Sequence, residues 1–279
     1  MDWKGREQSQ NVEDRRGSSG GGGGGKTPGI LGIIVVLIGA YYGVDLSGLV
    51  GTPSMGTGST QTSQLKPQEE AELNELARVV LADTEKAWGS YFKQIGRTYT
   101  PTTLVLYNGG TSTACGMGQS AMGPFYCPGD QKVYLDLDFY RDMQTKLNSA
   151  SDAAFAYVIA HEVGHHVQNL LGILPKVHRM QQQVGKKEAN ALSVKLELQA
   201  DCFAGIWGHY AVNNKIFKAE DIPKAMLAAE SVGDDRLQKE GQGYVVPDSF
   251  THGSSEQRMA WLKRGLDSGD INQCNTFGN

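Results

Sequence analysis

The chain has 279 residues and a formal net charge of −4, from 26 basic and 30 acidic side chains. This acidic balance, with no basic cluster in the part of the chain after residue 46, argues against a nucleic-acid partner. The segment 66–279 is long enough to bury one sizeable core, so we expect a single folded domain there.

The part of the chain before this domain indicates a membrane anchor between two flexible segments. Residues 1–26 hold five basic side chains and end in a glycine run, which predicts a disordered cytoplasmic leader. Residues 27–46 are almost uncharged and strongly apolar, which predicts one transmembrane signal anchor, with a cleaved signal peptide as the alternative. Residues 47–65 are rich in Gly, Ser and Thr and predict a flexible linker. The positive-inside rule then places the N-terminus in the cytoplasm and the domain on the outer side of the cytoplasmic (inner) membrane.

Residues 66–279 predict an α+β domain that is mainly helical and has a small sheet. A starting proline and helical spacing predict a helix over Pro67–Ile95, followed by a short strand at Thr102–Tyr107. A Pro-Gly turn separates Phe125–Cys127 from Lys132–Leu137, which predicts a hairpin. Its second strand is either an edge strand that pairs with a substrate or part of a plain structural hairpin. Two later helices are expected, at Asp221–Ser231 and from Ser254 onward.

The segment Ala153–Leu171 predicts a buried helix that carries the pattern His-Glu-x-x-His. His161 and His165 are four residues apart, so a helix places both on one face, where two neutral imidazoles supply half of a tetrahedral zinc site. Glu162 lies between them and can serve as general base toward the attacking water. Because burial of these polar groups is costly unless something satisfies them, we expect Zn²⁺ at this position.

A second predicted helix, downstream of the first, supplies the third ligand. The extended metzincin pattern is absent, because Gln168 and Leu171 stand where it requires Gly and His. Glu197 and Asp201 are four residues apart and therefore lie one turn from each other on one face. We expect Glu197 to be the third ligand and Asp201 to accept the outer N–H of a ligand histidine, with Asp201 as the direct ligand in the alternative.

The segments 161–168 and 196–205 resemble the bacterial family of neutral zinc metallopeptidases of the YpfJ type. Further matches lie in residues 1–16, 123–128 and 252–258, so the resemblance spans essentially the whole chain. It implies zinc binding and peptidase activity. The Glu-x-x-Ala-Asp element is also similar to that of integral-membrane gluzincins, which implies a zincin-like fold.

His252 is the candidate for stabilising the oxyanion of a tetrahedral intermediate. It stands on a glycine-containing turn just before the helix at Ser254, where no apolar pattern accounts for it. Tyr134, Tyr210 and Arg258 are the alternatives. His166 faces away from the pair and is expected to be structural or to support a ligand from behind, whereas His178 and His209 are expected on the surface or in the core.

Four cysteines without C-x-x-C spacing argue against a zinc knuckle and, outside the cytoplasm, indicate disulfides. We pair Cys115 with Cys127 and Cys202 with Cys274. Spacing alone allows three pairings, and free buried thiols are the other alternative.

These patterns together predict a membrane-anchored zinc endopeptidase that acts on a protein or peptide substrate. Two alternatives are open: a catalytically inactive zinc-binding adaptor or sensor, and a metal-dependent hydrolase of cell-wall amides. The presence of Glu162 disfavours the adaptor, because zinc binding alone does not need that carboxylate.

Overall fold

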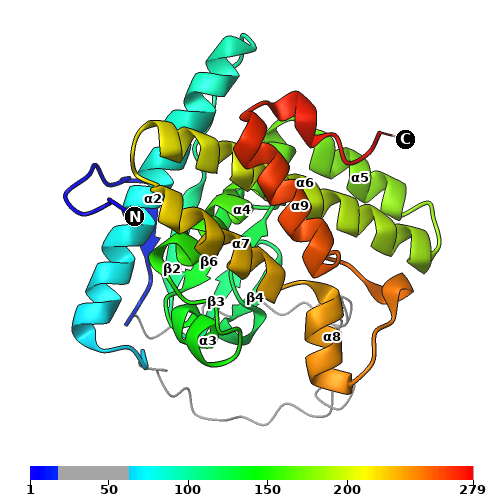
Figure 1. Ribbon diagram of the computed structural model, residues 1–279, viewed down its shortest axis with the longest axis horizontal. Coiled ribbons are helices and arrows are strands. Elements are labelled where there is room, and N and C mark those ends of the chain that lie inside the picture. The colour runs from blue at the N-terminus through cyan, green and yellow to red at the C-terminus, as the bar shows by residue number, and fades with distance from the viewer. Residues whose placement is uncertain (18–62, 279) are drawn as a thin grey trace.

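In the computed structural model, residues 1–17 and 63–278 are described, and most of them are helical (Figure 1). The longer helices are α2 (Pro67–Gln94), α4 (Asp152–Leu170), α6 (Lys186–Asn213) and α9 (Ser255–Ser268). The shorter helices are α3 (Phe139–Thr145), α5 (Ile173–Gln181), α7 (Ile222–Ser231) and α8 (Asp234–Gln242). Together with a small sheet they form the expected α+β fold.

The starts of three long helices follow from their first residues. Helix α2 begins with Pro67, whose missing N–H would have no partner inside the helix. In α4 the Ser151 hydroxyl accepts a hydrogen bond from the Ala154 N–H at 3.0 Å. Helix α9 has the predicted capping box, in which Ser254 and Gln257 each accept the backbone N–H of the other.

The main sheet has four strands, in the spatial order β1 (Val12–Asp14), β2 (Thr103–Tyr107), β6 (Lys132–Asp136) and β5 (Phe125–Cys127). β1 and β6 run parallel to β2, whereas β5 runs antiparallel to β6. The predicted hairpin is therefore present. The edge role expected for Lys132–Leu137 is wrong, because β6 pairs with β2 on one side and β5 on the other, and among the described strands β5 forms that edge.

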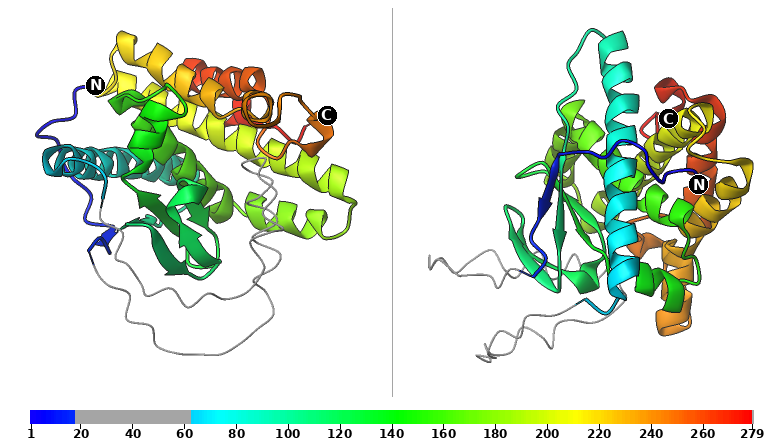
Figure 2. Two further views of the ribbon diagram at one scale, coloured as in Figure 1. Left: turned by 90° about the horizontal axis from the view of Figure 1, so that it is seen from below. Right: turned by 90° about the vertical axis from the view of Figure 1, so that its left-hand side faces the viewer.

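Helix α4 occupies the centre of the domain, with the sheet on one side and helices on the other (Figure 2). It contacts β5 and β6 on the sheet side, α2 along its length, and α6 and α7 on the opposite side. Of its 19 residues, 15 are buried, including the residues that precede the His-Glu-x-x-His motif. A second, separate hairpin is formed by β3 (Gly110–Thr113) and β4 (Gly116–Gln119).

Helices α6 and α9 approach each other closely at two glycines. A Cβ atom added to Gly205 would lie 2.2 Å from the Leu262 carbonyl oxygen. A Cβ added to Gly265 would lie 1.9 Å from the Cys202 carbonyl oxygen. Only glycine allows two backbones to come this close. The crossing holds Arg258, near the start of α9, beside Asp201 in the middle of α6.

The N-terminal segment 1–17 packs on the domain, so the expectation of a disordered leader does not hold for it. Strand β1 pairs with β2 in register from Val12 with Leu104 to Asp14 with Leu106. The Trp3 side chain is buried, and its indole N–H donates to Asp152, the first residue of α4, at 2.7 Å. Residues 1–17 and the helix that carries the histidine pair are thus parts of one folded unit.

Three sequence predictions lie wholly or largely outside the described residues. They are the glycine run, the transmembrane anchor at 27–46 and most of the linker at 47–65. The last linker residues are placed: the Ser63 hydroxyl donates to Asp138 at 2.8 Å, and Leu65 is buried. Within residues 1–17 and 63–278, no helix combines the length and the apolar character that a membrane crossing requires.

Both expected disulfides are formed. Cys115–Cys127 joins the turn between β3 and β4 to the end of β5. Cys202–Cys274 joins α6 to the 3₁₀ turn Ile271–Cys274 near the C-terminus. The second bridge crosses 72 residues of sequence and fixes the C-terminal tail beside the helix that carries Glu197.

Candidate metal centre

Three side chains from two helices converge at the centre of the domain. α4 contributes His161 and His165, and α6 contributes Glu197. The Nε2 atom of His161 lies 3.1 Å from one Glu197 carboxylate oxygen, and the Nε2 atom of His165 lies 3.3 Å from the other. One ligand atom from each of the three residues lies within 4.8 Å of the others.

This arrangement fits a zinc ion. Ligand atoms about 2.0–2.1 Å from a tetrahedral zinc are about 3.3 Å from one another, close to the two observed nitrogen–oxygen separations. Both His161 and His165 use their outer nitrogen, Nδ1, in a hydrogen bond to another side chain. Each Nε2 therefore faces the other ligand atoms, and two imidazoles with one carboxylate form a donor set that zinc accepts.

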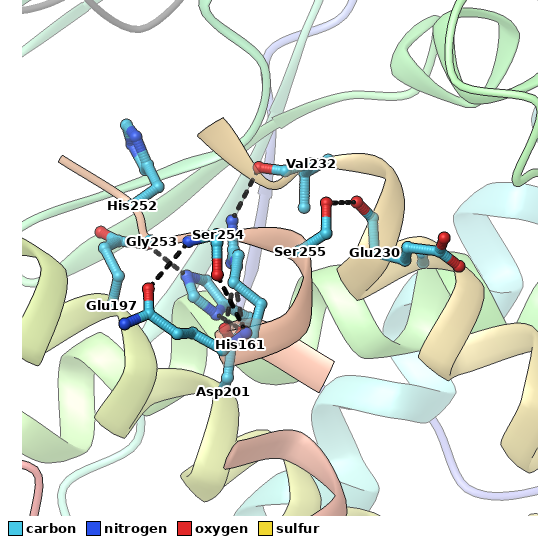
Figure 3. A network of polar contacts seen from close by, with 12 residues as sticks. His161, Glu197, Asp201, Glu230, Val232, His252, Gly253, Ser254 and Ser255 are labelled. Atoms are coloured by element: carbon cyan, nitrogen blue, oxygen red, sulfur yellow. Dashed lines mark hydrogen bonds and ion pairs between the residues drawn. The ribbon is translucent and has the colours of Figure 1, made fainter. Parts of the chain in front are cut away.

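Asp201 lies behind the three residues and is completely buried. Its Oδ1 atom is 2.8 Å from His161 Nδ1, which must donate because a carboxylate can only accept. Figure 3 shows His161 between Asp201 and Glu197. Asp201 thus occupies the supporting position expected for it, whereas Glu197 lies in the group of three ligand atoms.

A buried network fixes Asp201 in place. The Arg258 guanidinium donates to both carboxylate oxygens, at 2.9 and 3.1 Å, and the Tyr157 hydroxyl donates to Oδ1 at 2.6 Å. Arg258 also donates to the Val232 carbonyl at the end of α7. Burial alone would raise the pKa of Asp201, but the charges of Arg258 and His161 outweigh burial and lower the pKa below its ordinary value. Asp201 therefore stays ionised and keeps accepting the hydrogen bond from His161 Nδ1.

Glu162 lies next to the three converging residues and faces a cavity of about 400 Å³. Its side chain is buried, and this burial raises the pKa of its carboxyl above the ordinary value. The same cavity is lined by His161, His165 and Glu197. A carboxylate with a raised pKa beside a cavity has the properties of a general base.

His252 lines the same cavity and stands on the loop before α9 (Figure 3). Asp234, at the start of α8, is buried and holds this loop: its carboxylate accepts the backbone N–H groups of Thr251, His252 and Gly253. The His252 Nδ1 atom lies 3.3 Å from the other Asp234 oxygen. Burial would raise the pKa of Asp234, but the hydrogen bonds from His252 and its neighbours lower it. Asp234 and the Thr251 hydroxyl, whose Oγ1 atom lies 2.9 Å from the same ring nitrogen, therefore orient the ring of His252.

The edge strand β5 forms part of the cavity wall. Phe125 and Tyr126 both line the cavity. The Tyr126 hydroxyl donates to Nδ1 of His166, whose Nε2–H donates to the Thr100 carbonyl at 2.7 Å. Because burial lowers the pKa of His166, this ring stays neutral and can accept from Tyr126. His166 therefore has the structural role expected for it and ties α4 to β5.

The alternatives to His252 lie in other settings. Tyr134 is buried, stacks on Phe125 and donates its hydroxyl to Asp130. Tyr210 does not line the cavity. Arg258 lines the cavity but directs its guanidinium to Asp201, Tyr157 and the end of α7. Of the two remaining histidines, His178 lines the cavity from α5, and His209 hydrogen bonds to the Leu266 carbonyl.

Tyr157 and Asp234 were not among the site residues predicted from the sequence. Arg258 was predicted only as an alternative to His252 for stabilising the oxyanion. Tyr157 lies four residues before His161, so helical spacing could have placed it beside that histidine. No local signal identifies Asp234, because the backbone N–H groups that its carboxylate accepts belong to a loop 17 to 19 residues later in the chain.

Comparisons with known proteins identify a family and two similar relatives. The family model described as "putative neutral zinc metallopeptidase" matches residues 1–277. The chain is 54% identical, over 100% of its length and 99% of the relative's, to the "uncharacterized protein YpfJ" of Escherichia coli strain K12. It is 39% identical to an uncharacterized protein of Mycobacterium tuberculosis strain H37Rv, over 74% of this chain and 73% of that one. No solved structure matches.

Proposed function

Because the chain belongs to the neutral zinc metallopeptidase family, we propose that it is a zinc-dependent endopeptidase of the gluzincin type. The observation that carries the proposal is the convergence of His161, His165 and Glu197 within 4.8 Å, next to the carboxylate of Glu162. His161, His165 and Glu197 would hold the metal. When bound there, zinc supplies a Lewis acid and makes water more acidic.

In this mechanism Glu162 takes the proton of the attacking water and later gives it to the leaving amine. The buried position of Glu162 favours both steps, since a raised pKa brings its proton affinity closer to neutral pH. In its doubly protonated form, with Nδ1–H directed to Asp234, His252 would donate a hydrogen bond from Nε2–H to the oxyanion that develops on the substrate carbonyl. Asp201 keeps His161 in the tautomer that presents Nε2.

The proposed substrate is an extended peptide. β5 is the edge of the main sheet and borders the cavity, so its backbone is available to pair with a peptide in extended conformation. Apolar and aromatic residues contribute to the cavity wall, among them Phe125, Phe139, Val158 and Leu174. We therefore propose a bulky apolar side chain next to the bond that is cleaved.

The two disulfides favour an oxidising compartment, and we propose that the domain works outside the cytoplasm. The contacts of Trp3 and β1 with the domain require residues 1–17 to be on the same side of any membrane as residues 63–278. The proposal therefore places both parts together, in contrast to the cytoplasmic leader expected from the positive-inside rule.

The decisive experiment compares the purified full-length chain with its Glu162→Gln variant. The variant should bind one zinc per chain like the wild type, and its hydrolysis of an unstructured protein such as casein should fall at least about 10²-fold. Glu220→Gln, an exchange of the same kind at an exposed position, is the matched control and should leave hydrolysis unchanged. Hydrolysis by Glu162→Gln at the wild-type rate would refute the mechanism.

The same preparations separate the two alternatives. Release of fragments from peptidoglycan without hydrolysis of casein would identify a cell-wall amide hydrolase. Stoichiometric zinc binding without hydrolysis of either material would identify an adaptor or sensor. In both cases the endopeptidase proposal would be wrong while the metal site stayed valid.

A further inference from the structure

A chain of buried amide groups leads away from the second histidine of the metal centre. Gln168 is completely buried one turn after His165 on α4, and its Oε1 atom lies 2.9 Å from His165 Nδ1. An amide oxygen can only accept, so Nδ1 carries the proton and Nε2 keeps its lone pair. This is the tautomer in which Nε2 can bind a metal.

The orientation of the Gln168 amide is fixed from its other end. Its Nε2 atom donates to the Leu196 carbonyl at 2.8 Å and to Gln199 Oε1 at 3.0 Å. If the amide were turned round, its oxygen would face two acceptors and its NH₂ group would face the protonated nitrogen of His165. The contacts on α6 therefore determine which atom His165 meets.

The chain of hydrogen bonds ends at the C-terminal disulfide. Gln199 is buried and donates to the Cys274 carbonyl at 3.0 Å. Cys274 is bonded through its sulfur to Cys202 on α6. The tail has one more anchor, because the Thr276 hydroxyl donates to the Lys195 carbonyl at 2.6 Å. The disulfide thus holds the carbonyl on which the orientation of Gln199 depends.

We propose that Gln168 and Gln199 are positioning residues for His165, and that the Cys202–Cys274 disulfide is required for high zinc affinity. The inference rests on the zinc site proposed above and adds a condition to it: the site is completed only after the chain has been oxidised. Forming the bridge transfers two electrons and two protons from the two thiols to a disulfide oxidant, which becomes a dithiol. Before that step the tail is not covalently held, and the zinc site lacks its outer support.

The test measures zinc affinity of the full-length chain by competition with a chromophoric chelator, so no peptidase activity is needed. Gln168→Met removes the acceptor at nearly constant volume and should weaken zinc binding about 10-fold to 100-fold. Gln199→Met should weaken it less, because Gln168 keeps its bond to the Leu196 carbonyl. Gln273→Met, an exposed glutamine in the same tail, is the matched control and should bind zinc like the wild type.

The role of the disulfide is tested with two double variants. Cys202→Ala with Cys274→Ala should lower zinc affinity at least as much as Gln199→Met. Cys115→Ala with Cys127→Ala removes the other disulfide and should leave zinc affinity within about twofold of the wild type, because the hydrogen bonds that the outer nitrogens of His161 and His165 form do not run through that bridge. Circular dichroism checks that each variant is folded before its affinity is compared.

A spectroscopic readout separates positioning from general loosening. Long-range ¹H–¹⁵N spectra of the zinc-free protein, recorded at a pH at which the His165 ring is neutral, should show His165 as the Nδ1–H tautomer in the wild type and as a mixture in Gln168→Met. Wild-type zinc affinity and an unchanged tautomer in Gln168→Met would overturn the inference. Unchanged affinity in the Cys202/Cys274 double variant would overturn the role of the disulfide. A wild-type chain that binds no zinc would instead overturn the proposed function and, with it, this inference.

Discussion

Replacement of Gly265 by alanine should separate the two helices that support the metal centre. Helix α9 meets α6 at this glycine, and an added Cβ would lie 1.9 Å from the Cys202 carbonyl oxygen and 2.9 Å from the Ile206 nitrogen. Cβ atoms essentially never approach other atoms within 3.0 Å. Because both neighbours are backbone atoms of a helix, no side chain can turn away, and α9 must shift by about 1 Å.

The expected cost follows from two opposing effects. Overpacking a close-packed interface costs about 1–3 kcal/mol, and the rigid backbone contact at Gly265 places this site at or above the upper end. Alanine is favoured over glycine inside a helix by about 1 kcal/mol, which offsets part of that cost. We expect a net loss of about 2–3 kcal/mol in the free energy of unfolding, or roughly 5–10 °C in melting temperature.

The shift should also reach the metal centre. Arg258 lies two turns before Gly265 on α9 and donates to both oxygens of Asp201, which holds His161. Moving α9 lengthens these hydrogen bonds, so zinc affinity should fall together with stability. Urea unfolding and chelator competition on the same preparation measure both quantities.

Gly89→Ala is the matched control. Gly89 lies inside α2, and a Cβ atom there would meet nothing within 4 Å. This variant should gain about 0.5–1 kcal/mol and keep the zinc affinity of the wild type. If Gly265→Ala were as stable as Gly89→Ala, the close approach of α6 and α9 would not exist in solution and the reasoning would be refuted.

Two further predictions concern the N-terminal segment 1–17. This segment packs on the domain, and the native cysteines of the described residues are all in disulfides. Cysteines introduced singly at the exposed positions Lys4 and Lys187 of the full-length chain should therefore be labelled by an impermeant maleimide from the same side of any membrane that holds the chain. Labelling from opposite sides would contradict the packing of Trp3. Hydrogen bonds from Arg15 and Lys132 lower the pKa of Glu13 to about 2, so its ionised form stabilises the fold above pH 4.5 and this contribution is lost as the pH falls toward 2. In urea unfolding at pH 6, the wild type should be more stable than Glu13→Gln by about 0.5 kcal/mol, a small value because the side chain is partly exposed. This difference should vanish near pH 2. A difference that stays constant with pH would show that Glu13 is not paired.

Local patterns in the sequence were sufficient to locate the four longer helices, α7 and three of the six described strands. The helix at Pro67–Ile95 and the hairpin at 125–137 were predicted within a few residues, because proline, turn residues and periodicity act over short distances. The capping box at Ser254 was also predicted correctly, since both of its partners lie within one turn. Strand β1 was missed, because so short a strand carries too little pattern and its partner β2 lies far along the chain.

The candidate site, too, has features that local spacing fixes and features that only tertiary packing fixes. A four-residue spacing on one helix places His161 beside His165, and the same spacing places Glu197 beside Asp201, whatever the rest of the chain does. The sequence could not decide which of these two carboxylates meets the histidines. The packing of α6 against α4 directs Glu197 to both Nε2 atoms and Asp201 to the outer nitrogen of His161.

What the sequence by itself determined is the local chemistry: two histidines and a glutamate on one helix, two acidic residues on another, and four cysteines. Only the tertiary structure decided which residues support them, because Arg258, Asp234 and Gln199 reach their partners across distant segments or through a loop. It also decided that residues 1–17 belong to the domain, since the burial of Trp3 depends on a surface formed by α4 and not on any pattern near Trp3 itself. Contacts between distant segments are set by how helices and strands pack, and short-range periodicity carries no information about that packing.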